Sequence, residues 1–271
     1  MQFEQIFGRT KPLIGMVHVW PLPGTARYDI GIEGIAQQAA AEAKLLEDAG
    51  FDALIVENMH DAPYLWGKLG PEITAAMTRV ALEVRSVVGL PIGVQVLSGG
   101  HREALASAVC GAGDFIRCEN YVYAHVADEG LASEAAAGEL LRYRRQIDAE
   151  RIGVFADIKK KHASHTITDD VSISEAAETA AFFGADALVV TGRATGQPTD
   201  LADVKAAKNA SGLPVVIGSG LRPENAAGVM EAADGAIAGS WYKQNGDWRQ
   251  PPDPRRLSEL MRAIDRVRLT A

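Results

Sequence analysis

The chain has 271 residues, 47% of them hydrophobic, which is enough apolar material for one large core. Its formal charge of −8 and its pI of about 5.3 argue against the basic surface of a nucleic-acid-binding protein. The two cysteines, Cys110 and Cys118, lack the spacing of a zinc site or a disulfide scaffold. We therefore expect a protein of the reducing cytoplasm that binds no nucleic acid.

The sequence also argues against a membrane anchor. Its first twelve residues lack the charged and then apolar pattern of a signal peptide. No apolar run reaches the length that is needed to cross a bilayer. We expect no transmembrane segment.

Short apolar runs alternate with amphipathic segments along the whole chain, as buried parallel strands alternate with helices. Strands are predicted at Pro12–His18, Asp52–Glu57, Pro91–Leu97, Asp114–Glu119, Ile152–Lys159, Asp186–Thr191, Pro214–Gly218 and Asp234–Gly239. Helices are predicted at Glu33–Ala49, Pro71–Val88, His101–Cys110, Ser133–Asp148, Ser174–Phe183, Asp200–Ala210, Pro223–Ala232 and from about Pro254. Eight such pairs predict a single α/β domain over residues 1–271, a (β/α)8 TIM barrel with residues 1–10 as an N-terminal lead-in.

Four joints between helix and strand share small residues and an aspartate, in the segments AGFDALIV, GAGDFIR, GADALVV and AADGAIA. Glycine suits the position just after a helix, where a positive φ is needed. A doubly wound open sheet is the alternative fold. It requires a glycine-rich dinucleotide turn after the first strand, and here that strand runs into His18, Val19, Trp20 and Pro21 instead.

Glycine and serine follow three of the later predicted strands. Glycine lets backbone N–H groups approach an anion closely, and in TIM barrels the loops after strands seven and eight commonly bind phosphate. The predicted phosphate-binding residues are Gly218, Ser219, Gly220, Gly239 and Ser240, with Thr191 and Gly192 on the adjoining edge. The sequence therefore predicts a phosphorylated small-molecule ligand.

The alternation of side chains along a strand predicts which residues face the barrel mouth. In the fifth strand it turns Asp157 and Lys159 inward together, and these two with Glu57 are the predicted catalytic residues, for acid–base work or carbonyl activation. Predicted substrate-binding residues are His18, Asn58, Gln95, Arg117, Lys161 and His162. The fourth strand leaves two alternatives open, with either Arg117 and Glu119 or Cys118 and Asn120 facing inward.

Each candidate also has a structural interpretation. The alternative for Asp157 and Lys159 is an ion pair that braces the barrel, and the alternative for His18 is a packing histidine. Thr191 and Ser240 would serve as strand-end caps. No arranged carboxylate accompanies His162 and His165, so we expect no metal site, and the sequence requires no cofactor.

The segments LIGMVHVWPLPGTARY, DALIVENMHDAPY, ADIKKKHASH, ALVVTGRATG, VVIGSGLRPEN and DGAIAGSWYK together resemble the BtpA/SgcQ family. That resemblance implies a TIM-type barrel like the ribulose-phosphate-binding barrels. One branch of the family is linked to the assembly or stability of photosystem I, and another to carbohydrate metabolism as a nucleosidase or sugar-phosphate enzyme. The fourth strand departs from the family, because Glu119 adds a carboxylate.

The leading hypothesis is an enzyme that acts on a phosphorylated sugar or nucleoside-like molecule, by isomerisation, lyase cleavage or glycosidic hydrolysis. A non-catalytic assembly factor for a membrane complex and a metabolite-sensing barrel are the alternatives. Because barrels of this type often pair, we expect a homo-oligomer.

Overall fold

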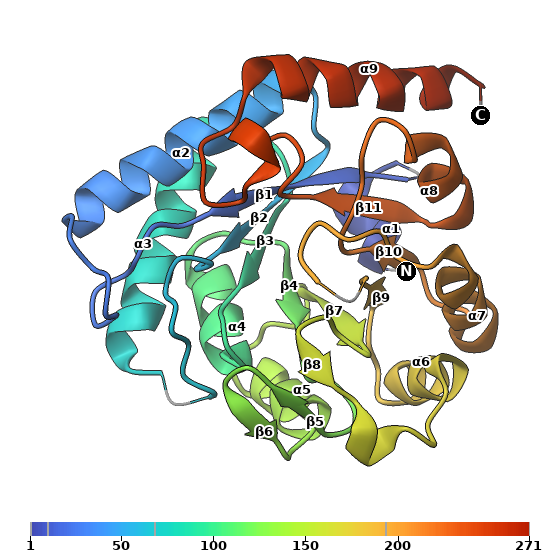
Figure 1. Cartoon of the computed structure of the whole chain (residues 1–271). Helices are drawn as coiled ribbons and strands as arrows, with labels where there is room; N and C mark the ends of the chain where they lie inside the picture. The colour runs from blue at the N-terminus through green and yellow to red at the C-terminus, as the bar shows by residue number, and fades with distance from the viewer. Residues whose placement is uncertain (1, 10, 68, 193, 271) are drawn as a thin grey trace.

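The computed structural model describes residues 2–9, 11–67, 69–192 and 194–270. The barrel strands are β1 (Leu13–His18), β2 (Ala53–Glu57), β3 (Ile92–Gln95), β4 (Phe115–Cys118), β7 (Gly153–Ile158), β9 (Ala187–Val190), β10 (Val215–Ile217) and β11 (Gly235–Ala238). The helices around them are α2 (Ile32–Ala49), α3 (Pro71–Val87), α4 (His101–Cys110), α5 (Ala137–Gln146), α6 (Ile173–Phe182), α7 (Leu201–Ser211), α8 (Ala226–Ala232) and α9 (Pro254–Thr270). Figure 1 shows these helices arranged on the outside of the strands.

The eight strands form a closed parallel barrel in the order β1-β11-β10-β9-β7-β4-β3-β2. The strand β1 closes the barrel, because it pairs with β2 on one side and with β11 on the other. The predicted (β/α)8 barrel is confirmed, and the open-sheet alternative is wrong.

The repeated aspartate before a strand has a structural role at the amino end of the barrel. Each carboxylate accepts the backbone N–H of the first or second residue in the neighbouring strand, at 2.7 to 3.0 Å. The pairs are Asp52 with Leu13, Asp114 with Ile92, Asp186 with Val154 and Asp234 with Val215. These bonds satisfy donors that a strand leaves open where its ladder begins, and they align adjacent strands.

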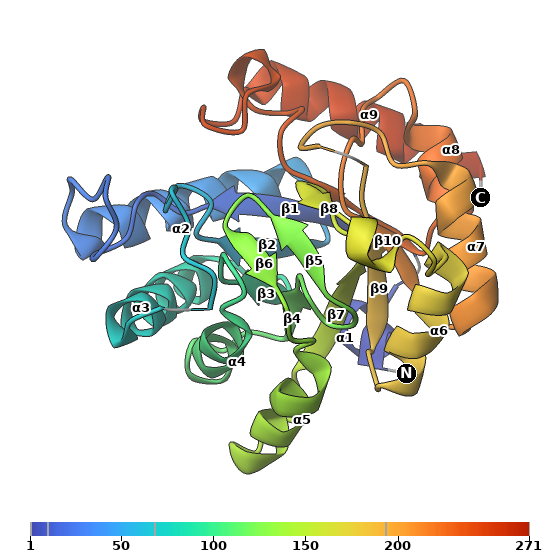
Figure 2. The same cartoon turned by 60° about the horizontal axis from the view of Figure 1, so that its bottom comes forward.

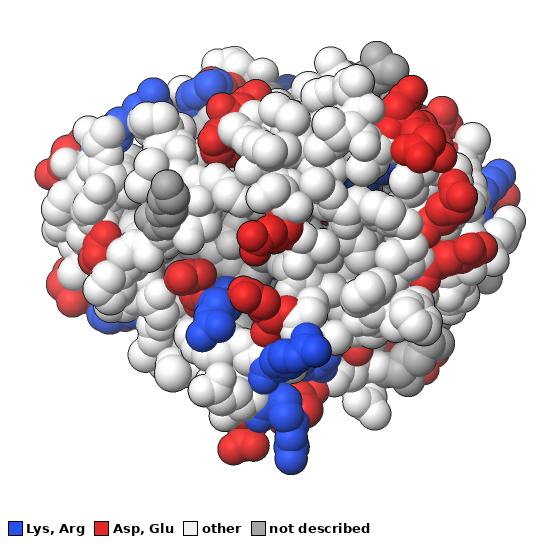
Figure 3. Space-filling model, turned by 90° about the horizontal axis from the view of Figure 1, so that it is seen from below, with Lys and Arg blue, Asp and Glu red and all other residues white. Residues whose placement is uncertain are grey.

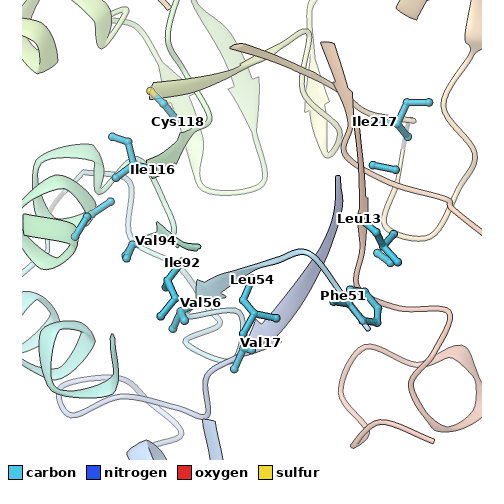
Figure 4. Close-up of a cluster of buried hydrophobic side chains, with 14 of the residues drawn as sticks. Leu13, Val17, Phe51, Leu54, Val56, Ile92, Val94, Ile116, Cys118 and Ile217 are labelled. Atoms are coloured by element: carbon cyan, nitrogen blue, oxygen red, sulfur yellow. The ribbon is translucent and has the colours of Figure 1, made fainter. Parts of the chain in front are cut away.

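Two apolar layers flank the strands. In the outer layer, Ile116 and Cys118 of β4 lie among side chains that pack toward the helices (Figure 4). Alternation then turns Arg117 inward, and Glu119 faces the inside with it. This packing decides between the two alternatives for the fourth strand.

The inner layer is closed at its amino end by α1 (Gln2–Phe7). Phe115 and Phe155 stack inside the barrel with ring centres 4.6 Å apart, and Phe3 and Phe7 of α1 pack against these rings at 5.6 to 5.9 Å. Glycine at position 93 is required here, because a Cβ would lie 2.4 Å from the ring of Phe115. The segment predicted as a lead-in therefore contains a helix that seals the barrel.

A small antiparallel sheet was not predicted. Its strands are β5 (His125–Ala127), β6 (Gly130–Ala132) and β8 (Ala163–Ser164), in the order β6-β5-β8. Figure 2 shows β5 and β6 side by side, in front of barrel strands in that view. Two short 3-10 helices complete the fold, η1 (Thr166–Thr168) and η2 (Gln244–Gly246).

Within the residues that the structure describes, no helix is both long enough and apolar enough to cross a membrane. On the face seen in Figure 3, Lys and Arg side chains are intermixed with Asp and Glu.

Replacing Phe155 with Ala tests the inner layer. Phe155 is fully buried between Phe115 and the rings of α1, so its loss leaves a cavity, and we expect the free energy of unfolding to fall by about 3–5 kcal/mol. Urea unfolding followed by circular dichroism measures it. Phe182→Ala is the control, because Phe182 is 87% exposed and should change the stability by less than about 0.5 kcal/mol. Equal effects of the two substitutions would contradict the packing described.

Candidate active site

A cavity of about 540 Å³ opens at the carboxyl end of the barrel. Its wall is formed by residues at the ends of β1, β2, β3, β4 and β7 and by the turns after β10 and β11. Catalytic groups of TIM barrels lie at this end. The cavity is therefore the candidate active site.

Five neighbouring strands each place one polar side chain on the cavity wall. In order around the barrel they are His18, Glu57, Gln95, Arg117 and Asp157, and all five are buried. The register explains the arrangement, since His18 lies beside Glu57 and Glu57 beside Gln95 in the parallel ladder. The structure thus brings together five residues that the sequence placed at the mouth.

Arg117 and Asp157 form a buried ion pair. Nε and Nη2 of Arg117 each donate a hydrogen bond of 3.0 Å to one carboxylate oxygen of Asp157. This two-bond arrangement fixes both side chains in one plane. Gly218 leaves room for it, because a Cβ at that position would lie 3.2 Å from Nη2 of Arg117. Both oxygens of Asp157 are engaged, so Asp157 acts on its surroundings through Arg117.

Glu57 and His18 form the second pair of titratable groups. Burial raises the pKa of Glu57 to about 7, although Arg117 and Lys161 act to lower it. Burial and the charge of Lys243 lower the pKa of His18 well below its usual value, so His18 is neutral. Its Nδ1 donates to the carbonyl oxygen of Trp248 at 3.1 Å, which leaves the lone pair of Nε2 facing Glu57 Oε2 at 3.7 Å. A proton on Glu57 therefore has an acceptor beside it.

The position predicted for Lys159 was wrong. The strand β7 ends at Ile158, and Lys159 has a φ of 45°, so the alternation of the strand does not continue to it. Its Nζ lies 3.5 Å from the carbonyl oxygen of Thr168, and the side chain lies outside the main cavity wall. The next two residues, Lys160 and Lys161, line the cavity instead.

Lys160 is held in a buried ion pair, with Nζ 3.0 Å from Oε1 of Glu119. Burial acts to raise the pKa of Glu119. The charge of Lys160 and a hydrogen bond from the N–H of Gly99 outweigh this effect and hold that pKa below its usual value. Both groups are thus charged and fixed. Glu119 was weighed only as one alternative of the fourth strand, and Lys160 was not predicted.

Lys161 has a different environment. Its backbone N–H donates to Oγ1 of Thr191 at 2.9 Å, but its Nζ has no hydrogen-bond or ion-pair partner within the described part of the chain. Burial and the nearby charge of Arg117 lower the pKa of Lys161 to about 8. Thr191 therefore positions Lys161.

The two predicted turns converge on the cavity. Gly218, Ser219, Gly220, Gly239 and Ser240 all lie on its wall. Gly220 has a φ of 77°, and a Cβ there would lie 2.3 Å from the carbonyl oxygen of Gln197, so only glycine fits. No described residue accepts the backbone N–H of Gly220 or Leu221. These donors remain for a ligand.

The adjoining edge differs from the prediction. Gly192 N–H donates to Oγ of Ser219 at 2.8 Å, and that hydroxyl donates to Gln197. Thr191 and Gly192 are not on the cavity wall. Gly192 supports the turn after β10, whereas Thr191 accepts the backbone N–H of Lys161 after β7. Thr195 and Gly196 line the cavity from this loop instead.

Asn58 also lies elsewhere than predicted. It is fully buried, and it donates to Asp61 at 2.7 Å and accepts the N–H of Leu97 at 2.6 Å. These bonds brace the loops after β2 and β3, so Asn58 is not on the cavity wall. His162 is on the wall, and its Nε2 accepts the N–H of Thr195 at 3.1 Å. Across the residues described, no three His, Cys, Asp or Glu side chains are grouped to hold a metal ion.

Aromatic, apolar and acidic side chains form the rim of the cavity, and none of them is among the predicted site residues. Tyr64 and Met59 come from the loop after β2, and Trp241 and Trp248 from the loop after β11. Asp128 and Glu129 stand at the turn of the β5–β6 hairpin and also line the cavity. The small sheet therefore covers part of the mouth.

The sequence matches the BtpA family over residues 9–266. The chain belongs to the BtpA family. It is 40% identical to a Caenorhabditis elegans protein whose name places it in mitochondria, over 98% of this chain and 97% of that one. It is 36% identical to the photosystem I biogenesis protein BtpA of Synechocystis, over 97% of this chain and 91% of that one.

Solved structures with the same barrel are distant in sequence. Orotidine 5'-monophosphate decarboxylase from Methanocaldococcus jannaschii has a TM-score of 0.60 at 12% identity, over 95% of this chain and 100% of that one. Phosphoribosyl anthranilate isomerase from Thermus thermophilus has a TM-score of 0.59 at 14% identity, over 94% and 99%. At such low identities the structural similarity establishes the fold alone.

Glu57 makes the stability of the fold depend on pH. Its pKa rises from 4.5 to about 7 on folding, so its contribution is fully present below pH 4.5 and is lost as the pH rises through 7. The loss amounts to about 3 kcal/mol. In Glu57→Gln, unfolding by urea between pH 4.5 and 7.5 should lack this fall. Glu178→Gln, at an exposed position on α6, should keep the wild-type slope, and the same slope in all three proteins would refute the raised pKa.

Proposed function

We propose that the protein is an enzyme that acts on a phosphorylated small molecule, with the phosphate held by the turns after β10 and β11. One observation supports the proposal: the backbone N–H groups of Gly220 and Leu221, which have no acceptor among the described residues, line the same cavity as Glu57 and Lys161. An anion site and groups whose pKa values lie near neutrality are the two requirements of acid–base chemistry on a phosphate ester.

The phosphate side of the cavity is built from backbone. Gly220 and Leu221 offer N–H groups, Gly239 and Ser240 face them across the same wall, and the hydroxyl of Ser240 has no partner among the described residues. Arg222 lines the same edge and adds a positive charge. Backbone N–H groups with a nearby cation are well suited to bind a phosphate dianion.

The opposite side carries the chemistry. Glu57, with its raised pKa and neutral His18 beside it, is suited to give and take a proton near pH 7. Gln95 is 2% exposed, and its Oε1 has no hydrogen-bond partner within the described chain. An unpaired buried acceptor on a cavity wall favours a ligand hydroxyl or amine at that place. The fixed Arg117–Asp157 pair would orient further hydroxyls.

Proteins of the same fold support this choice of substrate. Two of the structural neighbours are named for phosphorylated compounds, a decarboxylase of orotidine 5'-monophosphate and an isomerase of phosphoribosyl anthranilate. A phosphorylated sugar or nucleoside-like molecule also suits a cavity of about 540 Å³ with aromatic rims. Isomerisation, lyase cleavage and glycosidic hydrolysis are the reactions we propose to test.

Ser240→Asp tests the phosphate site. A carboxylate in the cradle repels a phosphate, so binding of inorganic phosphate and of ribose 5-phosphate should weaken at least tenfold, on the order of 1.4 kcal/mol. Calorimetric titration measures the affinity, and the ligand-dependent rise in melting temperature follows it. Ser240→Asn, which has nearly the same size without the charge, is the matched control. Unchanged binding in the aspartate variant would exclude the cradle as the phosphate site.

The name of the Synechocystis relative supports a second function, assembly of a membrane complex. Restoration of photosystem I in a Synechocystis strain that lacks BtpA distinguishes this second function from the proposed enzyme. The strain receives either the wild-type chain or the Ser240→Asp variant. If the protein is an assembly factor that does not use its cavity, both should restore the complex to the same level. A cytoplasmic location and a homo-oligomeric state stay predictions from the sequence.

A further inference from the structure

We propose that the amine of Lys161 is the nucleophile of the cavity and that the substrate carries an aldehyde or ketone that condenses with it. This inference rests on the proposed function for the phosphate of that substrate. It goes further in naming a carbonyl compound, a covalent imine and the lysine that forms it.

Lys161 differs from the buried lysines in its ion-pair partners. Lys161 is half-buried, and the two buried lysines each have a carboxylate partner, Lys160 with Glu119 and Lys243 with Glu42. Lys161 lines the cavity and has no such partner among the residues described. A cation that lacks a counter-charge in a protein interior is costly, and a substrate offers the compensation that the fold does not.

The surroundings of Lys161 also favour the uncharged form of its amine. Arg117 on β4 acts with burial to lower the pKa of Lys161 to about 8, while Glu57 on β2, Asp157 on β7 and Glu119 after β4 act to raise it. At neutral pH a fraction of the amine is thus uncharged, unlike an ordinary lysine. Only the uncharged amine attacks a carbonyl.

Glu57 supplies the proton transfers that an imine requires. Nζ of Lys161 bonds to the carbonyl carbon, the carbonyl oxygen takes the proton of Glu57, and the nitrogen then gives a proton back to the Glu57 carboxylate. Return of that proton to the hydroxyl lets it leave as water while the C=N bond forms. One carbonyl, one amine and protonated Glu57 yield one protonated imine, one water and the Glu57 carboxylate, which recovers its proton when the imine is later hydrolysed.

An imine narrows the reaction class. A protonated C=N bond withdraws electrons from the adjacent carbon, so it promotes removal of a proton or cleavage of a carbon–carbon bond there. These are the steps of isomerases and lyases. Hydrolysis of a glycosidic bond needs no such group, and so this inference favours the first two of the three proposed reactions.

Reductive trapping tests the imine. The full chain is incubated with dihydroxyacetone phosphate or pyridoxal 5'-phosphate, reduced with sodium borohydride, and analysed by intact and peptide mass spectrometry. We expect one adduct per chain at Lys161 and at least a tenfold lower yield in Lys161→Met. Lys205→Met, at an exposed position on α7, should keep the wild-type yield, and excess inorganic phosphate should suppress it.

Two further measurements distinguish failure of the imine proposal from failure of the proposed phosphate site. Lys161→Met should still bind inorganic phosphate, since the cradle is built from other residues, and its melting temperature should not fall. Equal adduct yields in the wild type and in Lys161→Met, or binding of dihydroxyacetone phosphate without any adduct, would overturn the role of Lys161 alone. Absence of all phosphate binding in the wild type would overturn the proposed function and this inference together.

Discussion

The buried ion pair of Arg117 and Asp157 is the contact on which the electrostatics of the cavity depend. It joins β4 to β7 at the barrel mouth, and Arg117 also lowers the pKa of both Glu57 and Lys161. Burial raises the pKa of Glu57 and Arg117 opposes that rise, whereas burial and Arg117 act together to lower the pKa of Lys161. Without Asp157, the guanidinium would be a buried charge with no direct partner, which is strongly destabilising.

Much of the fold follows from local patterns in the sequence. Apolar runs, glycine after helices and an aspartate before strands recur because each strand–helix unit solves the same packing problem. The aspartates were recognised, but their bonds to the neighbouring strand join residues such as Asp52 and Leu13, which only the closed barrel makes adjacent. The β5–β6 hairpin escaped prediction because strands of three residues show no periodicity.

Prediction of the site failed where side-chain direction depends on tertiary structure. Arg117 and Cys118 are both plausible inward residues, and the packing of Ile116 and Cys118 against helices decides between them. The inward direction of Lys159 assumed that the strand continues, whereas the chain turns after Ile158 and places Lys161 on the wall. Asn58 has a polar side chain at a strand end, but its partner Leu97 lies 39 residues away.

The two sides of the cavity present different kinds of polar group. Strands β1, β2, β3, β4 and β7 supply the polar side chains, whereas β10 and β11 run into glycine turns that supply backbone donors. Backbone donors hold an anion without a titratable group of the protein, whereas the opposite wall carries Glu57, whose pKa is about 7. If the proposed phosphate binds at these turns, the rest of the ligand extends toward the side of the cavity that carries Glu57 and Lys161. The proposed function thus implies one direction of binding in the barrel mouth.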